Sequence, residues 1–170
     1  NPMSKKVPFE TTIHVRDTCL CLHAQRAARA LARRFDEALR PVGITNGQFS
    51  LLMSLNRPHP PSIAPVARLL AMDRTTLPAA LKPLERRGLV VTEPDPKDRR
   101  SRLLLLTGKG HETLLTALPI WQATHAAVDA EMAESLPETG QGDVQAMLVA
   151  LGGSGAGRVS SGPRAGPEAA

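Results

Sequence analysis

The stretch EPDPKDRRSRLLLLTGKG, from Glu93 to Gly110, places a cluster of charges directly before an apolar segment. Four basic residues and two aspartates fall within the eight positions from 95 to 102, and four leucines follow. LVV at 89–91 and RLLLL at 102–106 each predict a short strand, and the charges between them predict an exposed turn. We therefore expect a β-hairpin with a charged tip, whose return strand packs one face against the rest of the protein.

The segment before this hairpin predicts two short helices joined by a tight turn. Ser62 can cap the first, over IAPVARLLAM, because serine is favoured at helix starts. Asp73 can cap the second, over RTTLPAALKPLERRG, and Gly88 can end it. The core-facing side of the second helix is expected to consist of Leu77, Leu81 and Leu84. Two short helices joined this tightly form a helix-turn-helix.

Long helices are expected on both sides of this lobe. The segment from Asp17 to Arg40 contains no Pro or Gly, and its apolar residues recur every three or four positions. A second long helix is expected from about Gly108 to Met132, and a final one near Gly142 to Leu151. The fold class is therefore expected to be mostly α with a small β-hairpin. The expected parts are an N-terminal extension (1–16), a domain (17–151) containing the helix-turn-helix and hairpin lobe (about 45–107), and a flexible tail (152–170).

Composition excludes several protein classes. The chain has 170 residues, of which 42% are hydrophobic, so one domain with a real core is expected. No apolar run approaches the roughly 18 residues of a membrane span, and NPMSKKVPFE at the start has no apolar signal segment. A cytoplasmic location without membrane contact is expected. Two cysteines make neither a disulfide framework nor a zinc site, and no metal or cofactor is expected.

The positive charge of the chain is concentrated in one segment. From Arg74 to Lys109 there are nine Lys or Arg residues and four Asp or Glu residues, which equals the whole net charge of +5. A localised basic surface is typical of proteins that bind polyanions. The alternative is a solvated face without a partner.

The wing-like hairpin carries a family resemblance. DPKDRRSRLLLLT followed by GKG resembles the MarR family of transcription regulators, whose wing typically reads D-x-R-D-R-R and then L-T-x-x-G. Lys97 replaces the usual Arg, and the similarity extends over about Asp17 to Leu151. The residues that match the motif are Asp95, Asp98, Arg99, Arg100, Leu106, Thr107 and Gly110.

This resemblance implies a winged helix-turn-helix protein that binds double-stranded DNA and has no catalytic activity. It implies a homodimer paired through the long N- and C-terminal helices, bound to a pseudo-palindromic operator. It also implies a repressor that a small molecule releases from DNA. An enzyme acting on an anionic substrate is the alternative, although no convergent acid, base or metal group accompanies the basic segment.

Candidate DNA contacts follow from the helix face opposite the three leucines and from the hairpin tip. Basic residues at such a tip suit the narrow minor groove. Arg86 could instead solvate the end of its helix. Pro78 and Pro83 remove backbone donors, so an irregular first turn and sparse base readout are expected. The candidates are Arg74, Thr75, Thr76, Ala79, Lys82 and Arg86 on the helix and Lys97 and Arg99 in the wing. By resemblance, Asp95, Asp98 and Arg100 brace the wing through ion pairs and hydrogen bonds.

The resemblance also implies an effector, here a small aromatic or phenolic molecule, that binds between the dimerisation helices and the DNA-binding lobe. Polar or aromatic residues that could line its pocket are His23, Arg26, Gln48 and Trp121. Core packing or surface exposure is the alternative for each of them. In a peroxide-sensing branch of the family, a reactive cysteine lies near the position of Cys21. This chain lacks the tyrosines of that branch, so Cys19 and Cys21 are expected to be small buried hydrophobes, and redox sensing through Cys21 remains the alternative.

Overall fold

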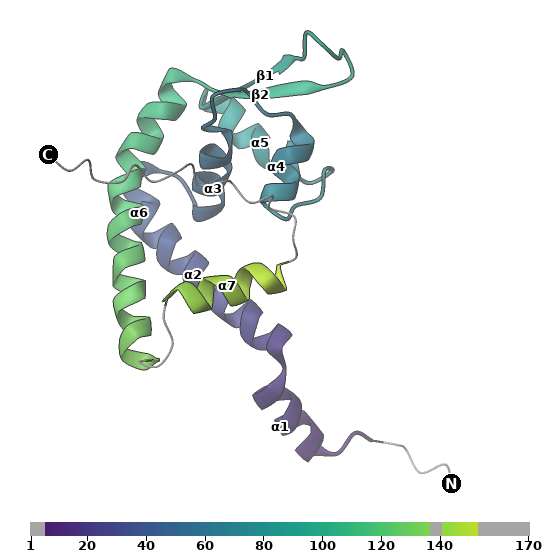
Figure 1. Ribbon diagram of the computed structural model, residues 1–170, viewed down its shortest axis with the longest axis vertical. Coiled ribbons are helices and arrows are strands. Elements are labelled where there is room, and N and C mark those ends of the chain that lie inside the picture. The colour runs from purple at the N-terminus through teal and green to yellow at the C-terminus, as the bar shows by residue number, and fades with distance from the viewer. Residues whose placement is uncertain (1–5, 137–140, 153–170) are drawn as a thin grey trace, which may run out of the picture.

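The computed structural model describes residues 6–136 and 141–152. A winged helix-turn-helix lobe sits at one end of two long helices (Figure 1), so the predicted fold class is confirmed. None of the helices in these ranges is long and apolar enough to cross a membrane. The elements in chain order are α1 (Phe9–Thr18), α2 (Leu20–Leu39), η1 (Arg40–Val42), α3 (Asn46–Leu55), α4 (Ile63–Leu69), α5 (Leu77–Arg86), β1 (Val90–Pro94), β2 (Arg102–Leu106), α6 (Gly108–Ser135) and α7 (Gln141–Leu151).

The long helix expected from Asp17 to Arg40 is interrupted. Cys19 adopts an extended backbone and its sulfur accepts the Leu22 N–H, so it caps the start of α2. Before the break, the Thr18 hydroxyl donates to the His14 carbonyl at 2.7 Å. Side-chain bonds of this kind compete with continued helical hydrogen bonding. The break separates α1, which buries no residue and projects away from the lobe (Figure 1).

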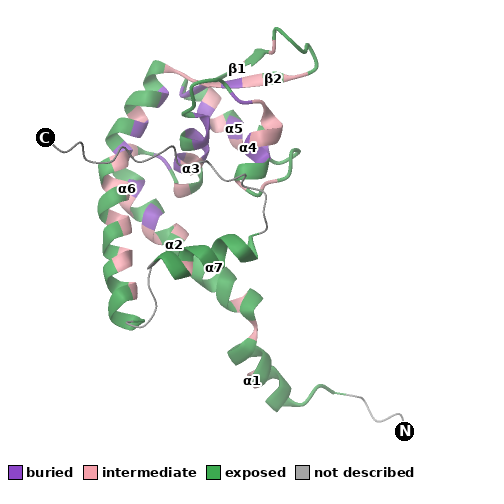
Figure 2. Ribbon diagram, viewed as in Figure 1, coloured by how far each residue is buried: buried purple, intermediate pink, exposed green. Residues whose placement is uncertain are grey.

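The hydrophobic core lies where α3, α4, α5 and the hairpin meet the adjoining ends of α2 and α6 (Figure 2). The three leucines predicted for the buried side of α5 are all buried there. In β2 only Leu104 is fully buried, because alternate side chains of a strand point to opposite faces. The largest fully buried side chains are Leu39, Leu52, Leu77, Leu84, Leu89, Leu104 and Val66, each of which contributes about 1.5–3 kcal/mol through burial.

The hairpin is fixed to the helices at its base. β1 and β2 pair antiparallel, with Val90 opposite Leu106 and Pro94 opposite Arg102. The segment before α4 adds a short third edge, since the Leu104 N–H donates to the Pro61 carbonyl at 2.9 Å. The pairing leaves only the tip, residues 95–101, projecting from the lobe.

Thr107 and Gly110, which follow the hairpin, determine how α6 begins. The Thr107 hydroxyl accepts the Gly110 N–H at 3.0 Å and donates to the Gly88 carbonyl at 2.7 Å. Gly110 is buried, and a Cβ on it would lie 2.2 Å from the carbonyl oxygen of Leu89. Thr107 and Gly110 therefore let α6 begin in backbone contact with the end of the helix-turn-helix.

Candidate nucleic-acid interface

Helix α5 begins later than the sequence predicts. The expected first residues, Arg74 to Thr76, form a turn in which the Asp73 carbonyl accepts the N–H groups of Thr76 and Leu77. A helix starting at Arg74 would need an N–H from Pro78, which proline lacks. With Leu77 as its first residue, Pro78 falls in the first turn, where no such donor is needed. The predicted irregular start is thus confirmed, and Asp73 does not cap α5 with its side chain.

All the candidate contacts of this helix-turn-helix are exposed. Arg74, Thr75 and Thr76 are presented by the turn, while Ala79, Lys82 and Arg86 lie on α5. They lie on the side of α5 away from its buried leucines. The structure therefore leaves all six side chains accessible to solvent.

Arg86 and Arg87 differ in their surroundings. Arg87 donates from Nη1 to the Gly43 carbonyl at 2.7 Å, and its own carbonyl accepts from Lys109 Nζ at 3.0 Å. Arg87 thus ties the end of α5 to the connection between α2 and α3. Gly88 follows with a positive φ of 68°, which ends the helix as predicted. Arg86 is exposed, which leaves it accessible to a phosphate.

The wing tip is held by its two aspartates through the backbone. Asp95 Oδ1 accepts the Lys97 N–H at 2.8 Å, and Asp98 Oδ1 accepts the Arg100 N–H at 2.9 Å. The bracing predicted for Asp95 and Asp98 is therefore present as hydrogen bonds. The ion pair predicted for Arg100 is not formed: within the described residues, its guanidinium joins no ion pair.

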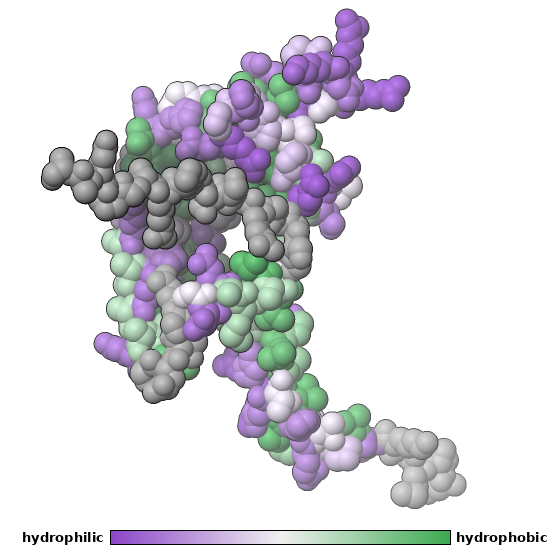
Figure 3. All heavy atoms as spheres, viewed as in Figure 1, coloured by the Kyte–Doolittle hydropathy of each residue, from purple (hydrophilic) through white to green (hydrophobic). Residues whose placement is uncertain are grey.

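Two cations of the wing, the candidate DNA contacts Lys97 and Arg99, are accessible to a partner. Lys97 and Arg99 are exposed at the tip, where hydrophilic side chains gather (Figure 3). In the middle of β1, the Thr92 hydroxyl donates to the Glu85 carboxylate of α5. This bond links β1 of the wing to α5 of the helix-turn-helix.

The four residues proposed for an effector pocket are not brought together. His23 lies near the start of α2, Arg26 faces solvent from the same helix, and Gln48 belongs to the capping box of Thr45. Trp121 is half-buried and packs against the core, where its ring stacks on Phe49 at 6.0 Å between centroids.

Trp121 lines an apolar cavity that the sequence does not predict. Its volume is about 360 Å³, and it lies between α3, the end of α4 and α6. The lining residues are scattered along the chain, so no local pattern indicates them: Phe49, Ser50, Met53, Ser54, Leu69, Leu118 and Trp121.

The cysteines are not the small buried hydrophobes that the sequence predicts. Cys21 is exposed, and its sulfur accepts from Gln25 Nε2 at 3.2 Å. Cys19 is half-buried and lies outside the helix that follows it. Both are free thiols. No three His, Cys, Asp or Glu side chains in the described ranges are grouped so as to hold a metal ion.

Comparison with known proteins places this interface in a family. Residues 44–110 match the family described as Winged helix DNA-binding domain. MosR, a transcriptional regulator of M. tuberculosis solved in complex with DNA, is 34% identical, with 79% of this chain and 93% of that chain covered and a TM-score of 0.68. CouR, a transcriptional repressor solved on a 23-mer DNA duplex, is 30% identical, with 81% and 94% covered and a TM-score of 0.69.

A curated relative extends the comparison. Transcriptional repressor MprA of Escherichia coli (strain K12) is 35% identical over 104 residues, which are 60% of this chain and 57% of that protein. The chain spans about half the length of the curated relatives it matches. The fold, the wing sequence and these matches show that the chain belongs to the MarR family of winged helix-turn-helix transcription regulators.

Proposed function

We propose that this protein is a cytoplasmic DNA-binding repressor that acts as a homodimer on a pseudo-palindromic operator and is released by a small molecule. The observation that carries the proposal is the shared exposure of the candidate contacts in the α5 turn, on α5 and at the wing tip. MosR and CouR, both solved with DNA, support it. The enzyme alternative lacks support, because the relatives are named as transcription regulators.

The geometry suits two grooves of one duplex. The turn before α5 and its first residues enter the major groove, where Arg74 and Thr75 reach base edges or phosphates. The wing tip follows into the adjacent minor groove, whose negative potential attracts Lys97 and Arg99. Because Ala79 and Pro78 occupy the first turn of α5, few side chains remain for direct base readout.

Thr75→Ala is expected to reduce sequence discrimination. The ratio of the affinity for an operator selected from random sequences to that for random DNA should fall about tenfold, because a base contact carries about 1–3 kcal/mol of discrimination. Lys82→Ala is the control, since a phosphate contact would weaken binding to both DNAs alike. Fluorescence anisotropy measures both affinities. Equal losses for Thr75→Ala on the two DNAs would show that this hydroxyl binds phosphate.

A dimer is expected from the apolar side chains left on the long helices. Leu20 of α2 is 73% exposed and Leu31 is 40% exposed, although both belong to the apolar residues that recur every three or four positions in this segment. Light scattering at micromolar concentration should give twice the chain mass, and Leu20→Asp with Leu31→Asp should shift it towards the monomer. Val91→Asp is the control, because Val91 of the wing is also 40% exposed. A parent protein with the mass of one chain would refute the dimer.

An aromatic or phenolic effector is supported by the cavity at Trp121. Its lining is mainly apolar, and Phe49 and Trp121 offer ring faces on which an aromatic ligand can stack. The cavity lies between α6 and the helix-turn-helix, so a ligand there would alter how the two pack. CouR has also been solved with p-coumaroyl-CoA, whose acyl group is phenolic.

Redox sensing is the second candidate, favoured by the position of the two thiols. Because the helix breaks at Cys19, the pair does not share one regular helix, and Cys21 is open to solvent. A hydroperoxide would oxidise the two thiols to a disulfide and leave as an alcohol and water. In this candidate an oxidant releases the protein from DNA, whereas in the first candidate a bound small molecule does so.

Mild peroxide treatment separates the two candidates. We expect the parent and the variant with Cys19→Ser and Cys21→Ser to bind operator equally well after treatment, because no cation in the described residues pairs with either thiol. Anisotropy before and after treatment measures this. A parent that releases DNA while the double variant does not would establish the redox candidate instead.

A further inference from the structure

Two adjoining cavities lie along α2. The larger, of about 740 Å³, extends from Ala30 to Thr45, and the smaller, of about 400 Å³, is lined by residues 26–33. They share Ala30 and Arg33. We name the combined surface the arginine basin after its five basic residues: Arg26, Arg29, Arg33, Arg34 and Arg40.

The basin carries uncompensated positive charge. Its lining contains five arginines and two carboxylates, Asp36 and Glu37, and Arg34 is further neutralised by Glu131 of α6, which leaves a formal charge of +2. Asp36 Oδ1 accepts the Asn46 N–H at 2.6 Å, and Glu37 lies 3.6 Å from Arg40. The two hydrogen bonds from Arg34 hold the pKa of Glu131 below its ordinary value.

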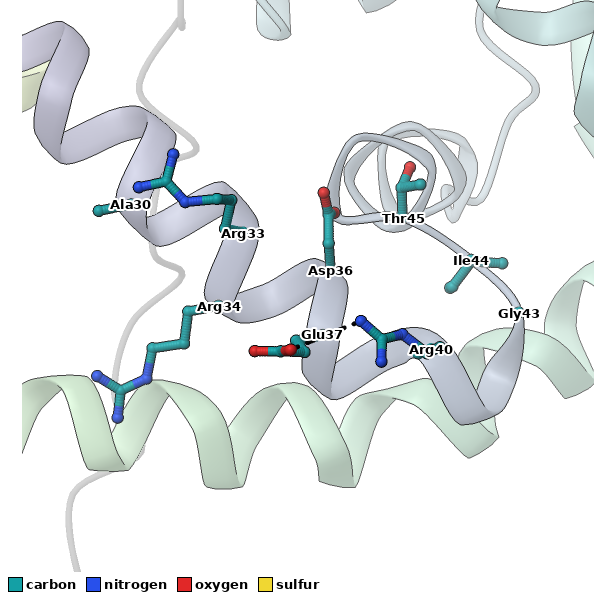
Figure 4. A pocket seen from close by; sticks show the side chains of 9 residues that line it. All are labelled: Ala30, Arg33, Arg34, Asp36, Glu37, Arg40, Gly43, Ile44 and Thr45. Carbon is teal, nitrogen blue, oxygen red and sulfur yellow. Dashed lines mark ion pairs between the residues drawn. The ribbon is translucent and has the colours of Figure 1, made fainter.

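The free charges are at the outer end of the basin. Within the described part of the chain, the guanidinium groups of Arg26 and Arg33 join neither an ion pair nor a side-chain hydrogen bond, and Arg29 donates only to the neutral Gln25. These three arginines recur at intervals of three and four residues, so they share one face of α2. Figure 4 shows Arg33 on the opposite side of the helix from Arg34, which extends towards α6.

This face is separate from the other proposed surfaces. Leu20 and Leu31 lie on the opposite side of α2 from Arg26, Arg29 and Arg33, so dimer formation through these apolar side chains leaves the three arginines accessible. α2 also leads away from the hairpin (Figure 1), so the basin does not adjoin the wing. The charge of the basin is therefore not part of the proposed DNA interface.

We propose that the arginine basin binds a small anionic ligand with at least two phosphate groups, which regulates the proposed DNA binding. Arginine presents a planar fork of donors that matches phosphate oxygens. Arg26 and Arg33 are seven residues apart, or about 10 Å along the helix, so two phosphates are needed to reach both. Ala27 and Ala30 also line the smaller cavity, and they provide a small apolar area for the part of the ligand between its phosphates. Nucleoside triphosphates and coenzyme A thioesters share this chemistry.

The inner end of the basin is connected to the recognition helix. Gly43 lines the basin, and its carbonyl accepts the hydrogen bond from Arg87 at the end of α5. Gly43 has a positive φ of 72°, and a Cβ there would lie 3.5 Å from Arg87 Nη2, so the guanidinium packs closely over this turn. A ligand that engages Arg40 and shifts the turn at Gly43 would therefore move the end of α5. This step rests on the proposed function.

Calorimetry without DNA tests the site, with ATP, coenzyme A and inorganic phosphate as probes. ATP or coenzyme A should bind at least tenfold more tightly than phosphate, and the variant with Arg26→Gln and Arg33→Gln should lose at least tenfold in affinity. Arg68→Gln, an exposed arginine on α4, is the matched control and should bind as the parent does. Binding of ATP alone or of coenzyme A alone identifies the source of the phosphates. No binding of either, or equal binding by the basin variant, overturns the site.

Operator binding tests the regulatory step. The bound probe should change the operator affinity of the parent at least fivefold, whereas Arg87→Gln should still bind the probe and show no such change. A parent that binds both probe and operator without mutual influence overturns the regulation. A parent that binds the probe and no DNA refutes the proposed function but leaves the site in place. A basin variant that loses the dimer would show that the arginines meet a second copy, which also overturns the ligand site.

Discussion

Gly110→Ala is expected to lower the free energy of unfolding by about 3 kcal/mol, as a buried backbone clash does. The added Cβ would lie 2.2 Å from the Leu89 carbonyl oxygen and 3.1 Å from Leu106 Cδ2. The Leu89 carbonyl accepts the Thr107 N–H at 3.1 Å, so the backbone cannot withdraw without losing this bond. Urea denaturation followed by circular dichroism measures the change.

Gly108→Ala is the matched control for this prediction. Gly108 lies in the same first turn of α6, but no atom would lie within 4 Å of its added Cβ. Since alanine favours the helix over glycine by roughly 0.5–1 kcal/mol, this variant should be as stable as the parent or slightly more stable. If Gly110→Ala unfolds at the same urea concentration as Gly108→Ala, α6 does not approach Leu89 as closely as the structure shows.

The features predicted well from the sequence are those that local patterns determine. The spacing of Leu77, Leu81 and Leu84 gives the buried side of α5 because a helix repeats every 3.6 residues. The strands of the wing follow from apolar runs on both sides of a charged turn. The resemblance names Thr107 and Gly110, but only the structure shows why these residue types are needed. Gly110 of α6 lies against Leu89 at the end of the helix-turn-helix, and this contact joins two separate elements.

The features that the sequence did not predict depend on one residue or on long-range contacts. Cys19 ends one helix and caps the next through a sulfur acceptor, and neither periodicity nor Pro or Gly indicates such a break. The contact of Arg87 with Gly43 joins residues 44 positions apart. The candidate effector residues were chosen singly for polarity or aromaticity, whereas the cavity at Trp121 is built mainly from apolar side chains of three helices. The flexible tail predicted for 152–170 lies, from residue 153 on, outside the described residues.

Arg99→Ala is expected to make operator binding less dependent on salt. Asp95 and Asp98 hold the tip through the backbone N–H groups of Lys97 and Arg100, so the side chain of Arg99 is not needed for the shape of the wing. If it enters the minor groove, each subunit loses one cation from contact with DNA. The dimer then releases about two fewer counterions, and the slope of log affinity against log salt should become shallower by roughly 2. Fluorescence anisotropy at four salt concentrations measures this slope.

Two further wing variants distinguish the effect of a lost cation on operator affinity from the effect of a changed tip conformation. Asp98→Ala removes the acceptor of the Arg100 N–H, so it should loosen the tip and lower operator affinity while retaining every cation and most of the salt slope. Arg100→Ala should leave the melting temperature unchanged, because its side chain forms no ion pair within the described residues. Arg99→Ala should likewise melt with the parent, so its loss of affinity reports contact with DNA and not unfolding. Unchanged affinity and salt slope for Arg99→Ala would mean that the wing does not touch DNA and that its charged tip is a solvated turn.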